Sequence, residues 1–389
     1  MRLSSFVQRI GGEGAAGWQI HFTARQAEAV GEDVIVLSVG DPDFSTPGPI
    51  IEAAVTALRD GDTHYAEIDG RAQLRASIAR RLATRHGLPV DETNVVPFAG
   101  TQNALFASCL CLFDQGDEVI VSDPMYLTYE ATIQATGAAV TRVPVVADGR
   151  FRPDVEAMAA AVGPRTSGIM LTTPANPTGV VMSRAELEVI AEAARRHDLW
   201  VITDEVYADL IFDGEHVAVG SLDGMADRTI TVGSLSKSHA MTGWRVGWAA
   251  GPAELRPHFY NLGLTMLYGL PGFMQQAAVA ALDGHDADVD EMRDIYRRRR
   301  DLAVEILEEA SDLPLLSPDA GMFLLADVSA HNGDATEWAW DLYRQTGVSV
   351  LDAGAFGAPA RGWVRISFTI SDDQLAEGCR RIVGFTRTK

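Results

Sequence analysis

Short apolar runs rich in β-branched residues alternate with helical patterns across the first three quarters of this chain. A run at 95–98 precedes a helix predicted from Thr101, and a run at 167–173 precedes, after a loop, a helix predicted from Ser183. Further strands are predicted at 117–122, 200–206, 229–236 and 245–250, and a further helix from about Met125. Near-continuous apolar strands separated by helices are typical of a mostly parallel sheet covered on both faces, so we expect an α/β protein.

The pattern changes after about residue 285. A long charged helix is predicted from Asp290 to Glu309, followed by shorter strands and helices, which indicates a smaller α+β domain. Within that long helix, Arg297–Arg300 forms a run of four arginines with acidic residues one turn to either side. We interpret this run as a solvated, ion-paired helix face rather than a nucleic-acid site.

Charge and composition exclude several classes of function. The 389 residues carry a formal net charge of −21, whose field repels polyanions such as nucleic acid. The three cysteines are too few for a disulfide framework, and the start of the chain lacks the apolar core of a signal peptide. Because there is also no uncharged apolar run of about 18 residues, we expect a soluble cytoplasmic protein that binds neither nucleic acid nor membrane.

Lysine is nearly absent. Of 32 basic side chains, only Lys237 and the final Lys389 are lysine. Arginine replaces lysine as a cation, but it cannot lose its proton and act as an amine nucleophile, for example in a Schiff base. Taken alone, the count fits compositional bias equally well. The residues around Lys237 are therefore needed to decide whether this lysine has a chemical role.

Polar residues follow the predicted strands at their carboxyl ends, where open parallel sheets bind ligands. Gly100, Thr101 and Gln102 open a helix directly after a strand, so their backbone N–H groups are placed to hold a phosphate. The other residues at strand ends are Asn176, Asp204, Tyr207, Ser234, Ser236 and Lys237, with Arg245 eight residues beyond the lysine.

Several competing sites lack a required residue. Gly233–Ser238 ends in Lys-Ser like a nucleotide P-loop, but Ser236 occupies the position before the lysine where that loop needs glycine. No GxGxxG follows an early strand, and HExxH and CxxC are absent, so neither a dinucleotide nor a metal is predicted. A lysine amine, a carboxylate, a phenol, an amide and a phosphate site together suit pyridoxal phosphate, whose pyridine nitrogen a carboxylate keeps protonated.

At these residues the sequence resembles the fold type I, class I/II pyridoxal-phosphate-dependent aminotransferases, over nearly the whole chain. The motifs that carry the resemblance are SVGDPDF (38–44), HYAEIDG (64–70), GTQNAL (100–105), DPMY (123–126), NPTG (176–179), TDEVY (203–207), SLSKSHAMTGWRVG (234–247), GMF (321–323) and VRISF (364–368). The resemblance implies a large domain with a mostly parallel seven-stranded sheet at 43–285 and a small domain at 286–389. Residues 1–42 would form an N-terminal arm and part of the small domain.

The resemblance also assigns roles to individual residues. The family pattern places the Schiff base on Lys237, the pyridinium partner on Asp204, ring-oxygen contacts on Asn176 and Tyr207, and the stacked aromatic ring on Tyr126. It places phosphate contacts on Gly100, Thr101, Gln102, Ser234 and Arg245, with Tyr65 reaching the neighbouring subunit of a homodimer with shared active sites. Arg365, with Gly40 and Asn176, matches the clamp for the substrate carboxylate, and we expect Trp18 in the side-chain pocket.

Within this family, segments such as GEGAAGWQIH (12–21) and DPMYLTYEA (123–131) look most like arginine–pyruvate transaminases. We therefore expect amino transfer from an L-amino acid, with arginine as the donor, to a 2-oxo acid. Aspartate, aromatic or other broad-specificity donors stay open, as do a pyridoxal-phosphate lyase or amino-acid oxidase on the same fold. A non-catalytic domain attached to a regulator is a further alternative, against which the intact Lys237 and the lack of a DNA-binding segment argue.

Overall fold

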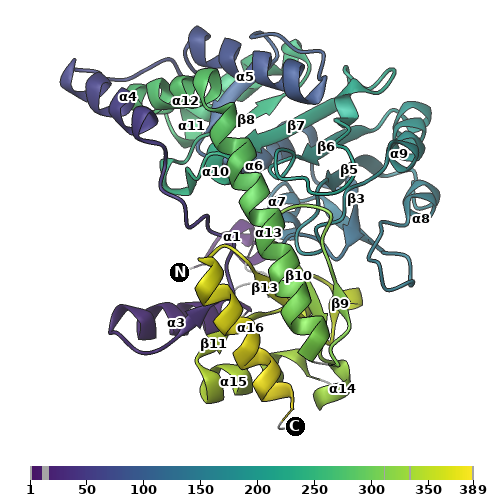
Figure 1. The fold of residues 1–389 in the computed structure, drawn as a ribbon. Coiled ribbons are helices and arrows are strands. Elements are labelled where there is room, and N and C mark those ends of the chain that lie inside the picture. The colour runs from purple at the N-terminus through teal and green to yellow at the C-terminus, as the bar shows by residue number, and fades with distance from the viewer. Residues whose placement is uncertain (1, 11–16, 311, 333, 388–389) are drawn as a thin grey trace.

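The computed structural model describes residues 2–10, 17–310, 312–332 and 334–387 (Figure 1). Residues 12–16 of the segment GEGAAGWQIH and the final Lys389 therefore lie outside the described residues. In the described part, no helix is both long and apolar enough to cross a membrane.

A seven-stranded sheet forms the centre of the larger lobe. In spatial order its strands are β2 (Val95–Phe98), β8 (Gly247–Ala250), β7 (Thr229–Ser234), β6 (Trp200–Asp204), β5 (Thr166–Thr172), β3 (Glu118–Asp123) and β4 (Ala139–Pro144). The strand β8 pairs antiparallel with both β2 and β7, and all other pairs in this sheet are parallel. The predicted α/β class and the mostly parallel seven-stranded sheet are confirmed.

Helices cover both faces of this sheet, as the continuous apolar strands predict. Val95 packs on one face with Leu74, while the next residue, Val96, packs on the other face with Leu105. The covering helices are α4 (Gly48–Arg59), α5 (Ala72–His86), α6 (Thr101–Leu112), α8 (Val155–Ala160), α9 (Arg184–His197), α11 (Arg256–Met266) and α12 (Gly272–Gly284). Successive side chains of a strand point to opposite faces, which explains why these strands are apolar at every position.

Two predicted helix starts show how local chemistry sets the boundaries. At α9, Ser183 Oγ accepts from the Glu186 N–H and the Glu186 carboxylate accepts from the Ser183 N–H, a reciprocal cap readable from the sequence. The helix expected from Met125 instead begins at Tyr129 as α7 (Tyr129–Gln134). The Met125 N–H donates to the Phe356 carbonyl at 3.0 Å, which ties this stretch to a distant loop rather than to a helical turn.

The smaller lobe contains two short sheets. In one, β1 (Ile35–Val36) pairs in parallel with β11 (Val348–Ser349); in the other, the order is β12 (Leu351–Asp352), β13 (Trp363–Ser367), β10 (Phe323–Asp327) and β9 (Leu315–Leu316). The main helices of this lobe are α3 (Gln19–Ala29), α15 (Ala335–Thr346) and α16 (Asp372–Thr386), with the short α14 (Ser329–Asn332) next to α15. The short α1 (Ser5–Arg9) instead contacts the larger lobe, where the Arg9 side chain donates to the Gln134 carbonyl of α7 at 3.0 Å. In Figure 1, the long α13 (Asp286–Ala310) runs from the larger lobe to the smaller one beside α16.

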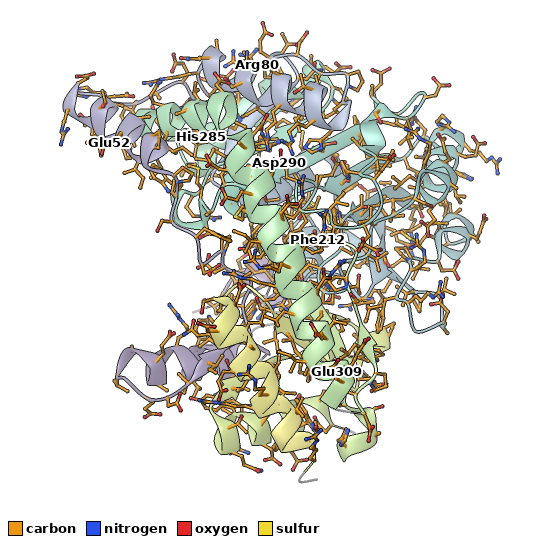
Figure 2. All side chains as sticks on the ribbon, viewed as in Figure 1. Glu52, Arg80, Phe212, His285, Asp290 and Glu309 are labelled. Atoms are coloured by element: carbon orange, nitrogen blue, oxygen red, sulfur yellow. The ribbon has the colours of Figure 1, made fainter. Side chains whose placement is uncertain are left out.

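The arginine run on α13 is ion-paired as predicted, but the interpretation as a solvated face is wrong for two of its members. Arg299 and Arg300 are 5% and 8% exposed. Arg299 binds both oxygens of Asp43 at 2.7 and 2.9 Å, and the Arg300 guanidinium lies 5.1 Å from the ring centre of Phe212, which Figure 2 shows beside the middle of the helix. The arginines therefore join α13 to both lobes.

Candidate active site

The strand register brings the predicted residues to one edge of the sheet. Thr172 of β5 pairs with Asp204 of β6, and Asp204 pairs with Val232 of β7, so these three strands end side by side. On the far side, Gly247 of β8 pairs with both Ser234 and Phe98. The loops that carry Asn176, Lys237, Arg245 and Gly100 consequently start from the same edge, where ligands bind in open α/β sheets.

Lys237 lies on α10 (Leu235–Ser238), one turn beyond the end of β7, rather than in the strand itself. Its Nζ donates to the Gly40 carbonyl at 2.6 Å, which connects the amine to the segment after β1. Burial lowers the pKa of Lys237 to about 8, with the charges of Arg365 and Arg245 acting in the same direction and that of Asp41 opposing them. An amine with this pKa is neutral, and hence nucleophilic, in an appreciable fraction of molecules near neutral pH.

Asp204 is a buried carboxylate held by two donors. Its Oδ2 accepts from the Tyr129 hydroxyl at 2.7 Å, and its Oδ1 accepts from the Val206 N–H at 3.1 Å. The Tyr129 oxygen itself accepts from Thr172 Oγ1 at 2.7 Å. Burial raises the pKa of Asp204 to about 6, against the lowering effect of the Tyr129 and Val206 hydrogen bonds. A cationic ligand beside this carboxylate would favour its ionised form.

The N-terminus of α6 forms a glycine-lined corner with Arg245. A Cβ on Gly100 would lie 2.3 Å from Arg245 Nη2, and a Cβ on Gly247 would lie 2.5 Å from the Gly100 carbonyl carbon. The Arg245 guanidinium donates to the carbonyls of Thr242 and Ala99 but has no ion pair among the described residues. Thr101 Oγ1 is buried without a hydrogen-bond partner in that same set. Helix N–H groups, an unmatched guanidinium and a free hydroxyl suit a phosphate.

Gln102 differs from its neighbours. Its Nε2 donates to Thr132 Oγ1 at 2.8 Å and its Oε1 accepts from Thr128 Oγ1 at 2.6 Å. Both ends of the side-chain amide are therefore used within the protein, and the group that remains for a ligand is the backbone N–H. At the opposite side of the corner, Ser234 Oγ caps α10 by accepting from the Ser236 N–H at 3.3 Å.

Arg365 of β13 reaches the site from the smaller lobe. Its side chain is 1% exposed and lies between two rings, 3.8 Å from the centre of Phe323 and 4.8 Å from that of Phe356. Nη1 donates to Asn176 Oδ1 at 2.8 Å and Nη2 to the Ser38 carbonyl at 3.1 Å, whereas Nε has no partner. No carboxylate pairs with this guanidinium among the described residues, so a carboxylate ligand would supply the missing charge.

The remaining predicted residues fall into three environments. Tyr207, at 5% exposed, and the mostly buried Tyr126 flank Asp204, and burial raises the pKa of each phenol. Trp18 precedes α3 and makes an edge-on ring contact with His21 at 5.9 Å. Tyr65 is 85% exposed, and its ring lies 4.7 Å from that of Tyr268, its one aromatic neighbour among the described residues.

Sequence reasoning missed Tyr129, Phe323, Phe356 and the Ser38 carbonyl. Tyr129 stands three residues after Tyr126, and that spacing was a usable signal, because residues i and i+3 approach one another at a helix start. The two phenylalanines gave no such signal, since an isolated Phe is most simply a core residue. Together these residues place a nucleophilic amine and a buried carboxylate between two guanidinium groups, those of Arg245 and Arg365. Neither guanidinium has an anionic partner among the described residues. This arrangement fits a phosphorylated aldehyde cofactor and a carboxylate substrate.

Comparisons with known proteins agree with this chemistry. The family described as Aminotransferase class I and II matches residues 32–382. The chain is 50% identical over 382 residues to arginine–pyruvate transaminase AruH of Pseudomonas aeruginosa, which covers 98% of this chain and 97% of that protein. It is 35% identical to the putative aminotransferase YugH of Bacillus subtilis, over 91% of this chain and 92% of that protein. The solved structure of Thermus thermophilus aspartate aminotransferase with maleate superposes with a TM-score of 0.93 at 33% identity, covering 99% of this chain and 100% of the other.

Proposed function

This chain belongs to the class I and II aminotransferases, and from that premise we propose that it moves the α-amino group of L-arginine to pyruvate. The enzyme uses pyridoxal phosphate and acts on an amino acid and a 2-oxo acid. The observation that carries arginine and pyruvate is the 50% identity, over 98% of the chain, to a protein named for that pair. Relatives named for aspartate, prephenate or aromatic amino acids are 30–34% identical.

When bound, pyridoxal phosphate supplies an aldehyde for covalent attachment and a ring that withdraws electrons. In our proposal Lys237 Nζ is the attached amine and later carries the transferred proton, and the Gly40 carbonyl orients it. Asp204 holds a proton at the pyridine nitrogen. Tyr207 and Asn176 bind the ring oxygen, and Tyr126 lies against the ring.

Two positions bind the anionic groups. The phosphate is held by Arg245, Ser234, Gly100, Thr101 and the backbone N–H of Gln102, where the glycines leave room and Arg245 has no ion-pair partner among the described residues. The substrate α-carboxylate is held by Arg365, with Asn176 and Gly40 beside it, and Trp18 contributes to the side-chain pocket. The buried guanidinium without a carboxylate partner supports this second assignment.

We also propose a homodimer in which Tyr65 completes the partner's phosphate site. Tyr65 is 85% exposed, its ring neighbour Tyr268 is 50% exposed, and Leu267, next to Tyr268 in the chain, is 41% exposed. Large apolar side chains gathered on one surface are typical of an interface.

The domain boundaries and the cellular location stay predictions. We propose domains at 1–42, 43–285 and 286–389 and a cytoplasmic location. The pairing of β1 with β11 supports joining the N-terminal segment to the small domain.

Attachment at Lys237 is tested by borohydride reduction of the coloured holoenzyme and peptide mapping. We expect the cofactor on the peptide that contains Lys237. Lys237→Arg should neither retain the cofactor covalently nor turn over, because a guanidinium with a permanent charge cannot form the imine. Attachment to another peptide, or a colourless protein that takes up no cofactor, contradicts the assignment.

The substrate pair is tested by a screen of amino donors, each with pyruvate and with 2-oxoglutarate as acceptor. Arginine with pyruvate should have the highest kcat/KM. A preference for aspartate or aromatic donors would favour the broad-specificity alternative, and product formation without a 2-oxo acid would favour a lyase or an oxidase.

The carboxylate clamp is tested by Arg365→Leu. Losing a desolvated charge pair costs about 2–5 kcal/mol, which corresponds to a loss in kcat/KM of about 30-fold to several thousand-fold at about 1.4 kcal/mol per factor of ten. The loss should be similar for arginine, alanine and pyruvate, since all three share the carboxylate. A loss confined to one donor would show that Arg365 recognises a side chain instead.

A further inference from the structure

Phe323 lies against the proposed carboxylate clamp, although the proposed reaction gives its side chain no role. It is the first residue of β10, is 4% exposed and pairs across the sheet with Ser367 of β13. In the same pair of strands, Arg365 stands opposite Leu325. Because alternate residues of a strand share a face, Phe323 and Arg365 are diagonal neighbours on one face. Aromatic and long side chains reach across such a diagonal, so the strand register itself brings the ring to the guanidinium.

The ring of Phe323 covers one flat face of the Arg365 guanidinium. The guanidinium carbon lies 3.8 Å from the ring centre, which is van der Waals contact, and 4.8 Å from the ring centre of Phe356. In the plane of the guanidinium, Nη1 donates to Asn176 Oδ1 and Nη2 to the Ser38 carbonyl. The two hydrogen bonds limit rotation within that plane, and the ring limits tilting out of it. Phe323 therefore fixes the plane in which the remaining N–H groups face a carboxylate.

The edge of the same ring meets Gly40. A Cβ on Gly40 would lie 2.3 Å from Phe323 Cζ and 2.8 Å from Cε1, which is closer than these atoms can approach. The φ of Gly40 lies outside the left-handed region, so its backbone conformation does not itself require glycine. The ring is what excludes a side chain at this position. The Gly40 carbonyl accepts from Lys237 Nζ at 2.6 Å, so the ring also contacts the residue that orients the amine.

We propose that Phe323 is a positioning residue for the substrate carboxylate, and that Gly40 serves the clamp by admitting this ring. The inference rests on the proposed role of Arg365. A guanidinium whose plane is fixed before the substrate arrives loses less freedom on binding, and this preorganisation strengthens the binding of every substrate that carries the carboxylate.

The role of the ring is tested by Phe323→Leu, which keeps an apolar side chain but removes the flat face. The KM values for arginine, alanine and pyruvate should each rise by roughly 5- to 30-fold, as expected for a desolvated cation–π contact. The kcat should stay nearly unchanged, because the ring acts on a contact that is the same in the bound substrate and in the transition state.

Phe212→Leu is the matched control. Phe212 is 7% exposed, and its ring centre lies 5.1 Å from the guanidinium carbon of Arg300, outside the proposed site. Both variants remove a buried ring beside an arginine and should lower the free energy of unfolding, but only Phe323→Leu should raise KM. Unchanged KM values in Phe323→Leu, or equal increases in both variants, would show that the ring is only structural and would overturn the inference.

The role of Gly40 is tested by a double-variant comparison. Gly40→Ala should raise the same KM values, because the added Cβ displaces the ring. A leucine at position 323 lacks the Cζ atom that meets Gly40, so Gly40→Ala should add little to Phe323→Leu. If the two losses multiply instead, Gly40 acts on the substrate independently of Phe323, and its assigned part is wrong. If Gly40→Ala does not fold, the comparison of Phe323→Leu with Phe212→Leu still decides. A variant Arg365→Leu with normal KM values would contradict the proposed function instead.

Discussion

Arg365, Lys237 and Asp204 are ionisable groups that the fold removes from water without pairing each of them with an opposite charge. Burial lowers the pKa of Lys237 to about 8 and that of Arg365 to about 10, and raises that of Asp204 to about 6. All three shifts favour the neutral form, so the folded chain alone gains nothing from their charges. Groups of this kind concentrate where a ligand of opposite charge binds.

At the scale of single residues, Tyr129 has the clearest untested role. Tyr129→Phe removes the hydroxyl that donates to Asp204 and lowers its pKa. Without that donor, the pKa of Asp204 should rise further above 6. The ionised form then needs a higher pH, so the acidic limb of the kcat/KM profile should move upward. At neutral pH we expect a loss of about 10- to 100-fold, smaller than the roughly 100- to 1000-fold loss of a donor that contacts the reacting atoms, because Tyr129 acts through Asp204.

A pH profile separates this effect from loss of structure, because part of the activity should return above pH 8. The matched control is Tyr343→Phe on α15, in the other lobe. An unmoved acidic limb in Tyr129→Phe would mean that the Val206 N–H alone keeps Asp204 ionised.

At the scale of elements, the N-terminus of α6 depends on a backbone that only glycine accepts. Gly100 has a φ of +82°, and a Cβ there would collide with Arg245 Nη2. Gly100→Ala should therefore weaken cofactor binding by about tenfold or more. The substitution strains the backbone and displaces the Arg245 guanidinium, and both changes distort the proposed phosphate site at the N-terminus of α6. The dissociation constant of the cofactor, measured on apoenzyme, checks this.

Gly31→Ala is the control for backbone strain, because Gly31 has a similar φ of +84° but open space around its Cβ position. It should lower stability without changing cofactor affinity. If both variants bind the cofactor equally well, the corner does not hold the phosphate.

The arginine run on α13 allows a comparison of two adjacent side chains. The Arg299 side chain, with 7% of its surface exposed, binds Asp43 and Asp372, whereas the Arg298 side chain, with 60% exposed, pairs only with Asp372 among the described residues. Arg299→Gln should lower the free energy of unfolding by about 1–3 kcal/mol, less than for a fully buried pair because both aspartates are partly exposed. Arg298→Gln should stay within about 0.5 kcal/mol of wild type. Urea unfolding at one protein concentration compares them, and equal effects would show that the burial of Arg299 is energetically irrelevant.

At the scale of the whole molecule, the proposed sharing of active sites between subunits predicts that two defective chains can together form one complete site. Lys237→Ala lacks the amine, and Tyr65→Ala lacks the phenol proposed to serve the partner. In a mixed dimer, one site combines an intact Lys237 with an intact Tyr65 from the other chain. Refolding the two variants together should therefore yield wild-type cofactor affinity at that site. If Tyr65 serves its own subunit, no site in the mixture regains it.

The grouping of the site residues could be predicted because most of them lie at or just after the carboxyl ends of apolar strands, which the sequence pattern marks. Asp204 ends an apolar strand, and Gly100, Asn176 and Lys237 each follow one by a few residues; parallel strands present their carboxyl ends at one edge. The α/β class and the cap of α9 were predictable for the same reason, since strand patterns and capping pairs act over a few residues. The long helix was also predicted, although α13 begins at Asp286 rather than Asp290.

The partners of these residues depended on packing between distant segments. Tyr129 meets Asp204 across 75 positions, Arg365 meets the Ser38 carbonyl across 327, and Arg299 is buried against Asp43 across 256. The sequence by itself determined which polar residues gather at one end of the sheet, because hydrophobic periodicity records local burial. The tertiary structure alone decided which group stands opposite each charge, because that contact arises only when separate elements pack together, and it controls the proton affinity of the site.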